Sequence, residues 1–253
     1  MPTIITPTTG IEIFYEDHGD PAHEVILLVM GLGAQMTLWP DELVEALVGE
    51  GFRVIRYDNR DIGLSQKIEG ARAPSLPMQV LRKKIGFPAR VPYTLADMAR
   101  DGIGVLDALE IGAAHVVGAS MGGMIAQLMA VHHPDRLLSL TSVMSTTGNP
   151  KLPPAEKNAM NALIAPLKGM DEETLVEHGL NIARNIGSPG FPFDPEQQRA
   201  KVLRNVRRSV YPAGPPRQLA AIIDDGDRRA RLAKVRVPTL VLHGEDDPLI
   251  KLP

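Results

Sequence analysis

The sequence predicts an α/β protein: a doubly wound, mostly parallel sheet with a helical cap insertion. Along the first 150 residues, short apolar runs alternate with stretches of helical spacing, which is the pattern of consecutive βαβ units. The rhythm then changes, because residues 154–210 have helical character throughout, with breaks at Gly169 and at residues 187–192. We therefore assign residues 1–150 and 212–253 to the core and residues 151–211 to the cap.

The first strands follow from hydrophobic periodicity. Residues 11–17 alternate polar and apolar side chains and are expected to form an exposed edge strand. Residues 25–30 (VILLVM) are a continuous apolar run, typical of a strand buried on both faces of a parallel sheet. Residues 53–57 (RVIRY) are the next strand. A helix is expected between these two strands over residues 38–49, with Pro40 in its first turn, where proline is tolerated.

The remaining core elements are separated by an irregular stretch. Residues 64–93 are interpreted as a long loop with room for one short helix. Thr94 is a plausible N-cap, with Asp97 three residues on, for a helix that ends near Leu109. Further strands are predicted over residues 115–119, 137–144 and 238–243, and further helices over residues 121–132 and 218–232.

Composition excludes several classes of protein. The 253 residues carry 27 Lys and Arg against 30 Asp and Glu, a net charge of −3, whereas nucleic-acid or anionic-membrane binding usually needs a basic excess. There are no cysteines, which excludes disulfides and thiolate ligands. No apolar run is long enough to span a membrane, and residues 1–10 do not resemble a secretory signal. We expect a cytoplasmic protein that binds neither nucleic acid nor membrane.

The sharpest local signal is the run Gly118-Ala119-Ser120-Met121-Gly122. It matches G-x-S-x-G and stands between a β-branched strand and an apolar helix, the context in which this motif forms a tight turn. The serine of such a turn takes strained backbone angles, and side chains at the two glycines would collide with the neighbouring strand and helix. The helix N-terminus favours developing negative charge. We predict that Ser120 is a catalytic nucleophile; the alternative is a glycine-rich turn with an incidental serine.

Three further segments accompany this turn: residues 29–33 (VMGLG), 54–61 (VIRYDNRD) and 241–248 (VLHGEDDP). Together with residues 115–123 they resemble the α/β-hydrolase fold family. Arg60-Asp61, where most of that family has Arg-Gly, points to the subgroup of aclacinomycin-methylesterase-like carboxylesterases. The resemblance spans nearly the whole chain and implies a serine hydrolase with a catalytic triad, an oxyanion hole and a cap. We interpret residues 58–61 as a loop-bracing network, with a catalytic role as the alternative.

Acyl transfer passes through a tetrahedral oxyanion, which two backbone N–H groups stabilise by on the order of 3–4 kcal/mol each. The residue after the nucleophile, Met121, is expected to supply one of them. The resemblance places the second at Leu32. Most of the family has His-Gly in this loop and this chain has Met30-Gly31, so the backbone donor is kept while the polar support of a histidine is lost. The alternative is that the glycines of this loop only end a strand.

Several methionines fall near the predicted strand ends, and methionine is a compliant filler of apolar pockets. We expect Met30, Gly31 and Met144 to contribute to substrate binding, which favours an apolar acyl or alkyl group over a sugar or a phosphate. Core packing is the alternative for the methionines. Because the chain shows no metal-ligand spacing and no phosphate-loop pattern, we expect no cofactor and no metal.

The resemblance places the triad acid at Asp247, which would hold an imidazole in one tautomer. Asp246 is the adjacent competitor, and an Asx-type turn before Pro248 is the structural alternative. In this fold the histidine follows the acid after a further strand, yet the chain stops six residues after Asp247 and its seven histidines all precede that residue. We therefore expect the last strand, the last helix and the triad histidine to lie outside this chain.

The sequence thus predicts a serine hydrolase of carboxylic esters that acts on a small-molecule ester through an acyl-enzyme on Ser120. The 253-residue chain alone is expected to be inactive. Its last strand would be an exposed edge, which invites self-association or complementation at residues 238–253. The alternative is a non-catalytic hydrolase-fold protein that binds a small apolar ligand.

Overall fold

The computed structural model describes residues 2–85 and 91–252 and divides into two compact units. The first unit contains Met1–Asn149 and Tyr211–Leu242. The second contains Pro150–Val210 and His243–Pro253. Residues 243–252, which the sequence analysis assigned to the core, fall in the second of these units.

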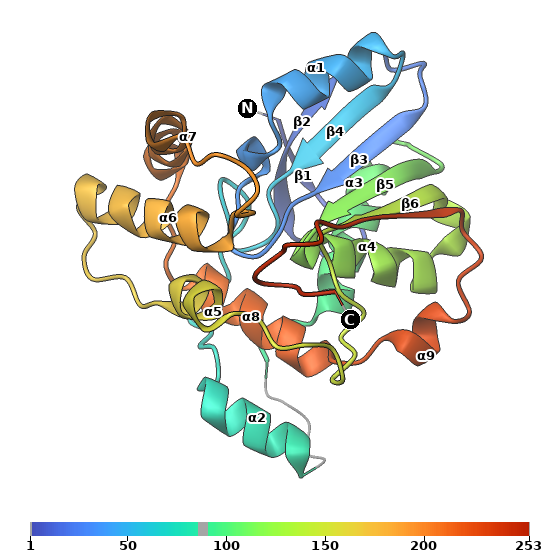
Figure 1. The fold of residues 1–253 in the computed structure, drawn as a ribbon. Helices are drawn as coiled ribbons and strands as arrows, with labels where there is room; N and C mark the ends of the chain where they lie inside the picture. Colours follow the sequence, from blue (N-terminus) through green and yellow to red (C-terminus); the bar gives the residue numbers. More distant parts are fainter. Residues whose placement is uncertain (1, 86–90, 253) are drawn as a thin grey trace. The chain divides into compact units, whose positions relative to one another are not determined.

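One mixed sheet forms the centre of the first unit (Figure 1). In the described part of the chain its order is β1-β2-β4-β3-β5-β6-β7. The two pairs that involve β2 are antiparallel and the other four pairs are parallel, so the expectation of a mostly parallel sheet is confirmed. The strands are β1 (Thr3–Ile5), β2 (Glu12–His18), β3 (Val25–Val29), β4 (Arg53–Tyr57), β5 (Ala114–Ala119), β6 (Leu137–Val143) and β7 (Thr239–Leu242).

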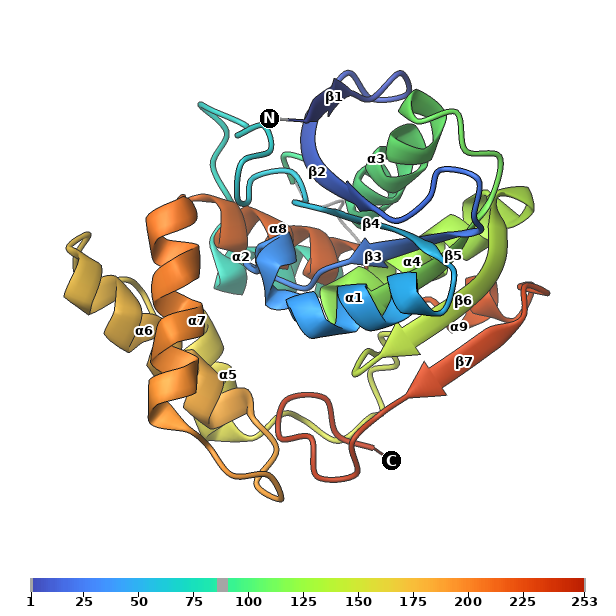
Figure 2. The ribbon, with the colours of Figure 1, turned by 90° about the horizontal axis from the view of Figure 1, so that it is seen from above.

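Helices cover both faces of this sheet (Figure 2), and β3 shows why its sequence is a continuous apolar run. Alternate side chains of a strand point to opposite faces. On one face, Val25, Leu27 and Val29 join a cluster with residues of α3 (Leu95–Ala108) and α4 (Met121–His132). On the other face, Ile26 and Leu28 join a cluster with Val44 of α1 (Asp41–Gly49). Since both faces are buried, no position in the strand is left for a polar residue.

The start of α3 and the irregular stretch before it agree with the sequence. The Thr94 hydroxyl accepts a hydrogen bond from the Asp97 N–H at 3.1 Å, and the Asp97 carboxylate accepts one from the Thr94 N–H at 2.7 Å. This reciprocal pair is the expected capping box. One short helix, α2 (Leu76–Lys84), lies in the loop of residues 64–93, of which residues 86–90 fall outside the described residues.

Two expectations about the core were wrong. β2 is not an edge strand, because β1 pairs with it; three residues are too few to show periodicity in the sequence. The helix expected over residues 218–232 is two helices, α8 (Gly214–Asp225) and α9 (Arg229–Leu232). Gly226, with φ of 64°, ends α8, a conformation that favours glycine.

The second unit is helical, with α5 (Lys157–Ile164), α6 (Glu172–Ile186) and α7 (Pro195–Arg208). Its breaks fall at Gly169 and within residues 187–192, as the sequence predicts. The helices α6 and α7 pack closely, since a Cβ at Gly179 would lie 2.5 Å from Val202 Cγ1. Across the described residues, none of the helices combines the length and the apolar character needed to cross a bilayer.

Candidate active site

Ser120 stands between β5 and α4 with φ of 55° and ψ of −118°. Such backbone angles cost a non-glycine residue on the order of 1–3 kcal/mol, so the surrounding structure must hold them. The Ser120 N–H donates to Val143 O at 2.9 Å, and Ser120 O accepts from Ser145 Oγ at 2.7 Å. The strained serine is therefore fixed from the end of β6, the neighbouring strand.

The two glycines of the motif allow the strand and the helix to meet at this serine. A Cβ at Gly118 would lie 2.2 Å from Gly122 O, and a Cβ at Gly122 would lie 2.0 Å from Val29 O. Both distances are far below van der Waals contact, so the predicted collisions are confirmed. The turn is thus closed by backbone packing that no other residue type permits.

Gly31, in the loop after β3, lies directly against Ser120. A Cβ on Gly31 would lie 3.2 Å from Ser120 Cβ and 3.7 Å from Ser120 Oγ. Ser120 is half-buried, and within the described ranges its Oγ takes part in no hydrogen bond. The structure therefore brings together three of the predicted site residues: Gly31, Ser120 and Met121.

Leu32 and Met121 are the two residues whose backbone amides were predicted to bind the oxyanion. Among the hydrogen bonds of residues 2–85 and 91–252, neither N–H donates to a protein acceptor. Met121 is the first residue of α4, where N–H groups lack a partner within the helix. Leu32 follows Gly31, and its half-buried side chain packs against the main core.

The loop after β3 is held by side chains from other segments. Asn59 Nδ2 donates to Met30 O at 2.8 Å, and the Asp58 carboxylate accepts from the Met36 N–H at 2.8 Å. Gln218 Oε1 accepts from the Gly33 N–H at 2.9 Å. These buried contacts confirm that the polar run after β4 braces loops. They also supply the polar support that the Met30-Gly31 sequence was expected to lack.

The same polar run ties the loop after β4 to two helices through buried ion pairs. Arg60 Nε lies 2.6 Å from Asp101 Oδ2 of α3. Arg217 of α8 donates to both carboxylate oxygens of Asp61, at 2.8 and 2.7 Å. Both partners of each pair are buried, so removing one charge would leave the other unpaired.

The two predicted binding methionines differ in exposure. Met30 is buried and its side chain packs in the cluster between β3 and α1. Met144, the residue after β6, is 47% exposed and has φ of 41°. Met144 therefore offers apolar surface one residue beyond Val143, whose carbonyl holds Ser120.

Asp247 belongs to the second unit. Its Oδ1 accepts from the N–H groups of Leu249 and Ile250 at 2.8 and 2.9 Å, which is the Asx-type turn that the sequence offered as the structural alternative to a catalytic role. Its Oδ2 lies 3.5 Å from His243 Nε2, which donates to Ile250 O at 2.6 Å. Asp246 makes no hydrogen bond within the described residues. Asp247 is thus the ordered carboxylate of this loop, with one oxygen committed to the backbone.

The histidines of the first unit have structural surroundings. His115 Nδ1 lies 2.8 Å from Ser139 Oγ, and its ring packs edge-on against Phe52. His18 lies 3.3 Å from the Glu16 carboxylate. Desolvation lowers the pKa of His133, at the end of α4, and the neighbouring His132 and Arg136 lower it further. None of the described histidines in this unit hydrogen-bonds to Ser120.

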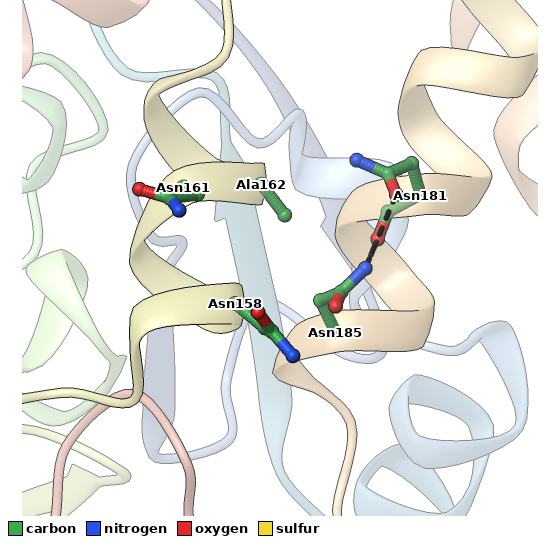
Figure 3. Close-up of a pocket in the computed structure, with 5 residues that line it drawn as sticks. All are labelled: Asn158, Asn161, Ala162, Asn181 and Asn185. Atoms are coloured by element: carbon green, nitrogen blue, oxygen red, sulfur yellow. Dashed lines mark hydrogen bonds between the residues drawn. The ribbon is translucent and has the colours of Figure 1, made fainter.

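The second unit contains a hollow of about 200 Å³ between α5 and α6 (Figure 3). Four asparagines and one alanine line it: Asn158, Asn161, Ala162, Asn181 and Asn185. Asn185 Nδ2 donates to Asn181 O at 2.7 Å, and none of the predicted site residues takes part. In the described ranges no group of three or more His, Asp or Glu side chains is placed to hold a metal ion.

Two residues of the site had escaped the sequence interpretation. Ser145 has a local signal, since it is a hydroxyl two residues after the end of β6, the strand beside the turn. Gln218 has none, because its partner Gly33 lies 185 residues away in the chain. A contact of that range is visible only once the fold is known.

Comparisons with known proteins agree with this arrangement. The family model described as alpha/beta hydrolase fold matches residues 24–252. Rhodomycin D methylesterase DauP of Streptomyces sp. strain C5 is 31% identical over 98% of this chain and 83% of its own length. The DnrP methylesterase of Streptomyces peucetius has the same identity and coverage.

Solved structures point the same way. A hydrolase from Pseudomonas aeruginosa PA01 superposes with a TM-score of 0.65 at 26% identity, covering 96% of this chain and 80% of that one. The enol-lactonase from Burkholderia xenovorans LB400, at 23% identity and a TM-score of 0.64, shares the fold over 95% of this chain and 80% of its own. This chain therefore belongs to the α/β-hydrolase fold family.

Proposed function

We propose that this protein is a serine hydrolase of carboxylic esters, with Ser120 as its nucleophile. The observation that carries the proposal is a serine with φ of 55° at the start of α4, facing Gly31 and the end of β3. The methylesterases among the relatives favour an ester as the substrate. No cofactor enters this chemistry.

In the proposed reaction Ser120 Oγ bonds to the ester carbonyl carbon and gives its proton to a histidine. The Leu32 and Met121 amides, which have no protein acceptor among the described residues, bind the oxyanion. The alcohol leaves with the histidine's proton, and water then releases the acid from the acyl-enzyme. Gly31 and Met144 border the acyl or alkyl group, whereas the Met30 side chain packs in the core between β3 and α1. The helices of residues 151–211 serve as a cap.

Asp247 is the proposed triad acid, which would hold the imidazole of the catalytic histidine in one tautomer. Its Oδ1 accepts from the Leu249 and Ile250 amides, which fixes the carboxylate, and its Oδ2, 3.5 Å from His243 Nε2, is the oxygen that would orient the catalytic imidazole. We expect residues 1–253 to turn over short p-nitrophenyl esters poorly or not at all, because none of the described histidines of the first unit hydrogen-bonds to Ser120. Rapid turnover by material of verified mass would show that a histidine of this chain serves as the base.

Covalent labelling tests the nucleophile. A fluorophosphonate should attach covalently to Ser120. Ser120→Ala should abolish attachment, and Ser139→Ala, a serine at the opposite end of the sheet, should leave it unchanged. Labelling that persists in Ser120→Ala would refute the proposal. A protein that binds an apolar ester without ever labelling Ser120 would instead support the alternative, a non-catalytic binder of small apolar ligands.

We also propose that the edge strand β7 mediates self-association or complementation. Its side chains Leu240, Val241 and Leu242 are 52%, 65% and 47% exposed, and an exposed apolar edge invites strand pairing. Val241→Lys should therefore shift the sedimentation profile towards the monomer. A wild-type chain that stays monomeric at high concentration would argue against a role for this edge.

A further inference from the structure

Gln218 is fully buried on α8, at 0% exposure, yet its carboxamide bonds to backbone atoms outside its own helix. Its Oε1 accepts from the Gly33 N–H at 2.9 Å, and its Nε2 donates to Arg60 O at 3.0 Å. A buried carboxamide without partners is costly, so both bonds are expected to persist. Gln218 thus links the loop after β3 to the loop after β4.

The hydrogen bond between Gln218 and Gly33 lies in the middle of the loop after β3, which contains Leu32. Asn59 holds the loop before this point, at Met30 O, and Asp58 holds it after, at the Met36 N–H. Gly31 lies close against Ser120 and its carbonyl accepts from the Ala34 N–H at 3.3 Å, while the Gly33 N–H donates to Gln218. The Leu32 amide therefore lies between two anchored residues, and Gln218 provides the second anchor.

Gln218 is itself on a rigid element. The neighbouring Arg217 forms the buried ion pair with Asp61. One turn earlier, a Cβ on Gly214 would lie 2.3 Å from Asp61 O, and Pro215 packs against Gly33, whose added Cβ would lie 3.3 Å from Pro215 Cγ. Because α8 is locked to the loop after β4, Gln218 cannot follow the Gly33 loop if that loop shifts.

We infer that Gln218 is a positioning residue for the oxyanion hole: it sets the place of the Leu32 amide relative to Ser120 Oγ. This rests on the proposed function, which gives that amide its role. A donor placed for the transition state affects the rate of bond formation at Ser120 more than the affinity for the ester. Loss of Gln218 should therefore slow the chemistry without a matching loss of binding.

The test compares two buried glutamines. Gln127 of α4 also makes two side-chain bonds, to Ser142 Oγ at 3.3 Å and from Arg228 Nε at 3.0 Å, but does not touch the loop. Gln218→Met and Gln127→Met remove the same chemistry at similar burial. The readouts are the rate of fluorophosphonate labelling of the folded chain, and amide exchange at Ala34 and Met36. The acceptors of these two amides, Gly31 O and the Asp58 carboxylate, are unchanged by either substitution.

We expect Gln218→Met to slow labelling of Ser120 by about 10-fold or more. Removing an oxyanion donor lowers the reaction rate in the same way. Exchange at Ala34 and Met36 should accelerate in Gln218→Met and stay at the wild-type rate in Gln127→Met. If Gln218→Met does not fold, Gln218→Asn and Gln127→Asn form the matched pair, since the shorter carboxamide cannot reach both partners.

Equal labelling rates for the two variants at equal folded fraction would overturn the inference. So would an unchanged exchange rate at Ala34 and Met36 in Gln218→Met. If the wild-type chain shows no labelling at Ser120, the proposed function fails. The amide exchange rates at Ala34 and Met36 then still show whether Gln218 holds the loop, so failure of the proposed function is distinguished from failure of this inference.

Discussion

Two turns meet at Ser120, and they are held in different ways. The turn after β5 is closed by backbone packing, because Gly118 and Gly122 leave no space for a side chain. The loop after β3 is held by side chains from distant segments: Asn59, Asp58 and Gln218. The sequence signal for the first turn lies within five consecutive residues, although the folded turn also packs on Val29 O and bonds to Val143 O. The second loop has no comparable local signal, because it is held by side chains from other segments.

This difference predicts how each turn fails. A side chain added in the turn after β5 collides with backbone, which cannot move aside without opening the sheet. A side chain removed from around the loop after β3 leaves an unpaired polar group, and the fold survives at a cost. Substitutions in the turn after β5 should therefore lower the stability of the fold. Substitutions around the loop after β3 should instead displace the Leu32 amide.

The largest effect is expected for Gly122→Ala. Its Cβ would lie 2.0 Å from Val29 O, so we expect a loss of more than about 4 kcal/mol of unfolding free energy or no soluble protein. Gly49→Ala, in α1, is the control, because a Cβ there meets nothing within 4 Å. Urea unfolding measures both. A Gly122→Ala protein of normal stability would remove the distinction between the two turns.

An intermediate effect is expected for Asn59→Ala. This change leaves the buried Met30 carbonyl without its donor, which should cost about 1–3 kcal/mol. The protein should remain folded but label more slowly at Ser120, because the loop with the Leu32 amide loosens. Asn185→Ala removes an exposed hydrogen bond between two asparagines of α6. It should change neither the free energy of unfolding nor the labelling rate at Ser120. Thermal unfolding and labelling rates together decide the outcome.

The smallest effect is expected for Ser145→Ala. Its hydroxyl donates to Ser120 O, but that oxygen also accepts from the N–H groups of Gly123 and Met124. The free energy of unfolding should fall by only about 0.5–1.5 kcal/mol, and labelling at Ser120 should persist. Loss of labelling in a stable Ser145→Ala protein would show that the turn after β5 also depends on side chains.

The same contrast explains what the sequence could predict. The turn at Ser120, the apolar run of β3 and the capping box of α3 each have a signal in consecutive residues, and all three were found. β1 was missed because it is short, and the break at Gly226 because one glycine within a helical pattern is a weak signal. The role of Gln218 was missed because its partner is remote. Features with a signal in neighbouring residues could be predicted from the sequence, whereas hydrogen bonds from distant side chains could not.

The most direct test of the account is a crystal structure of the fluorophosphonate adduct. The account predicts phosphorus bonded to Ser120 Oγ and the phosphonyl oxygen about 2.7–3.1 Å from both the Leu32 and the Met121 nitrogen. A phosphonyl oxygen that turns to solvent, or an adduct on another residue, would contradict it.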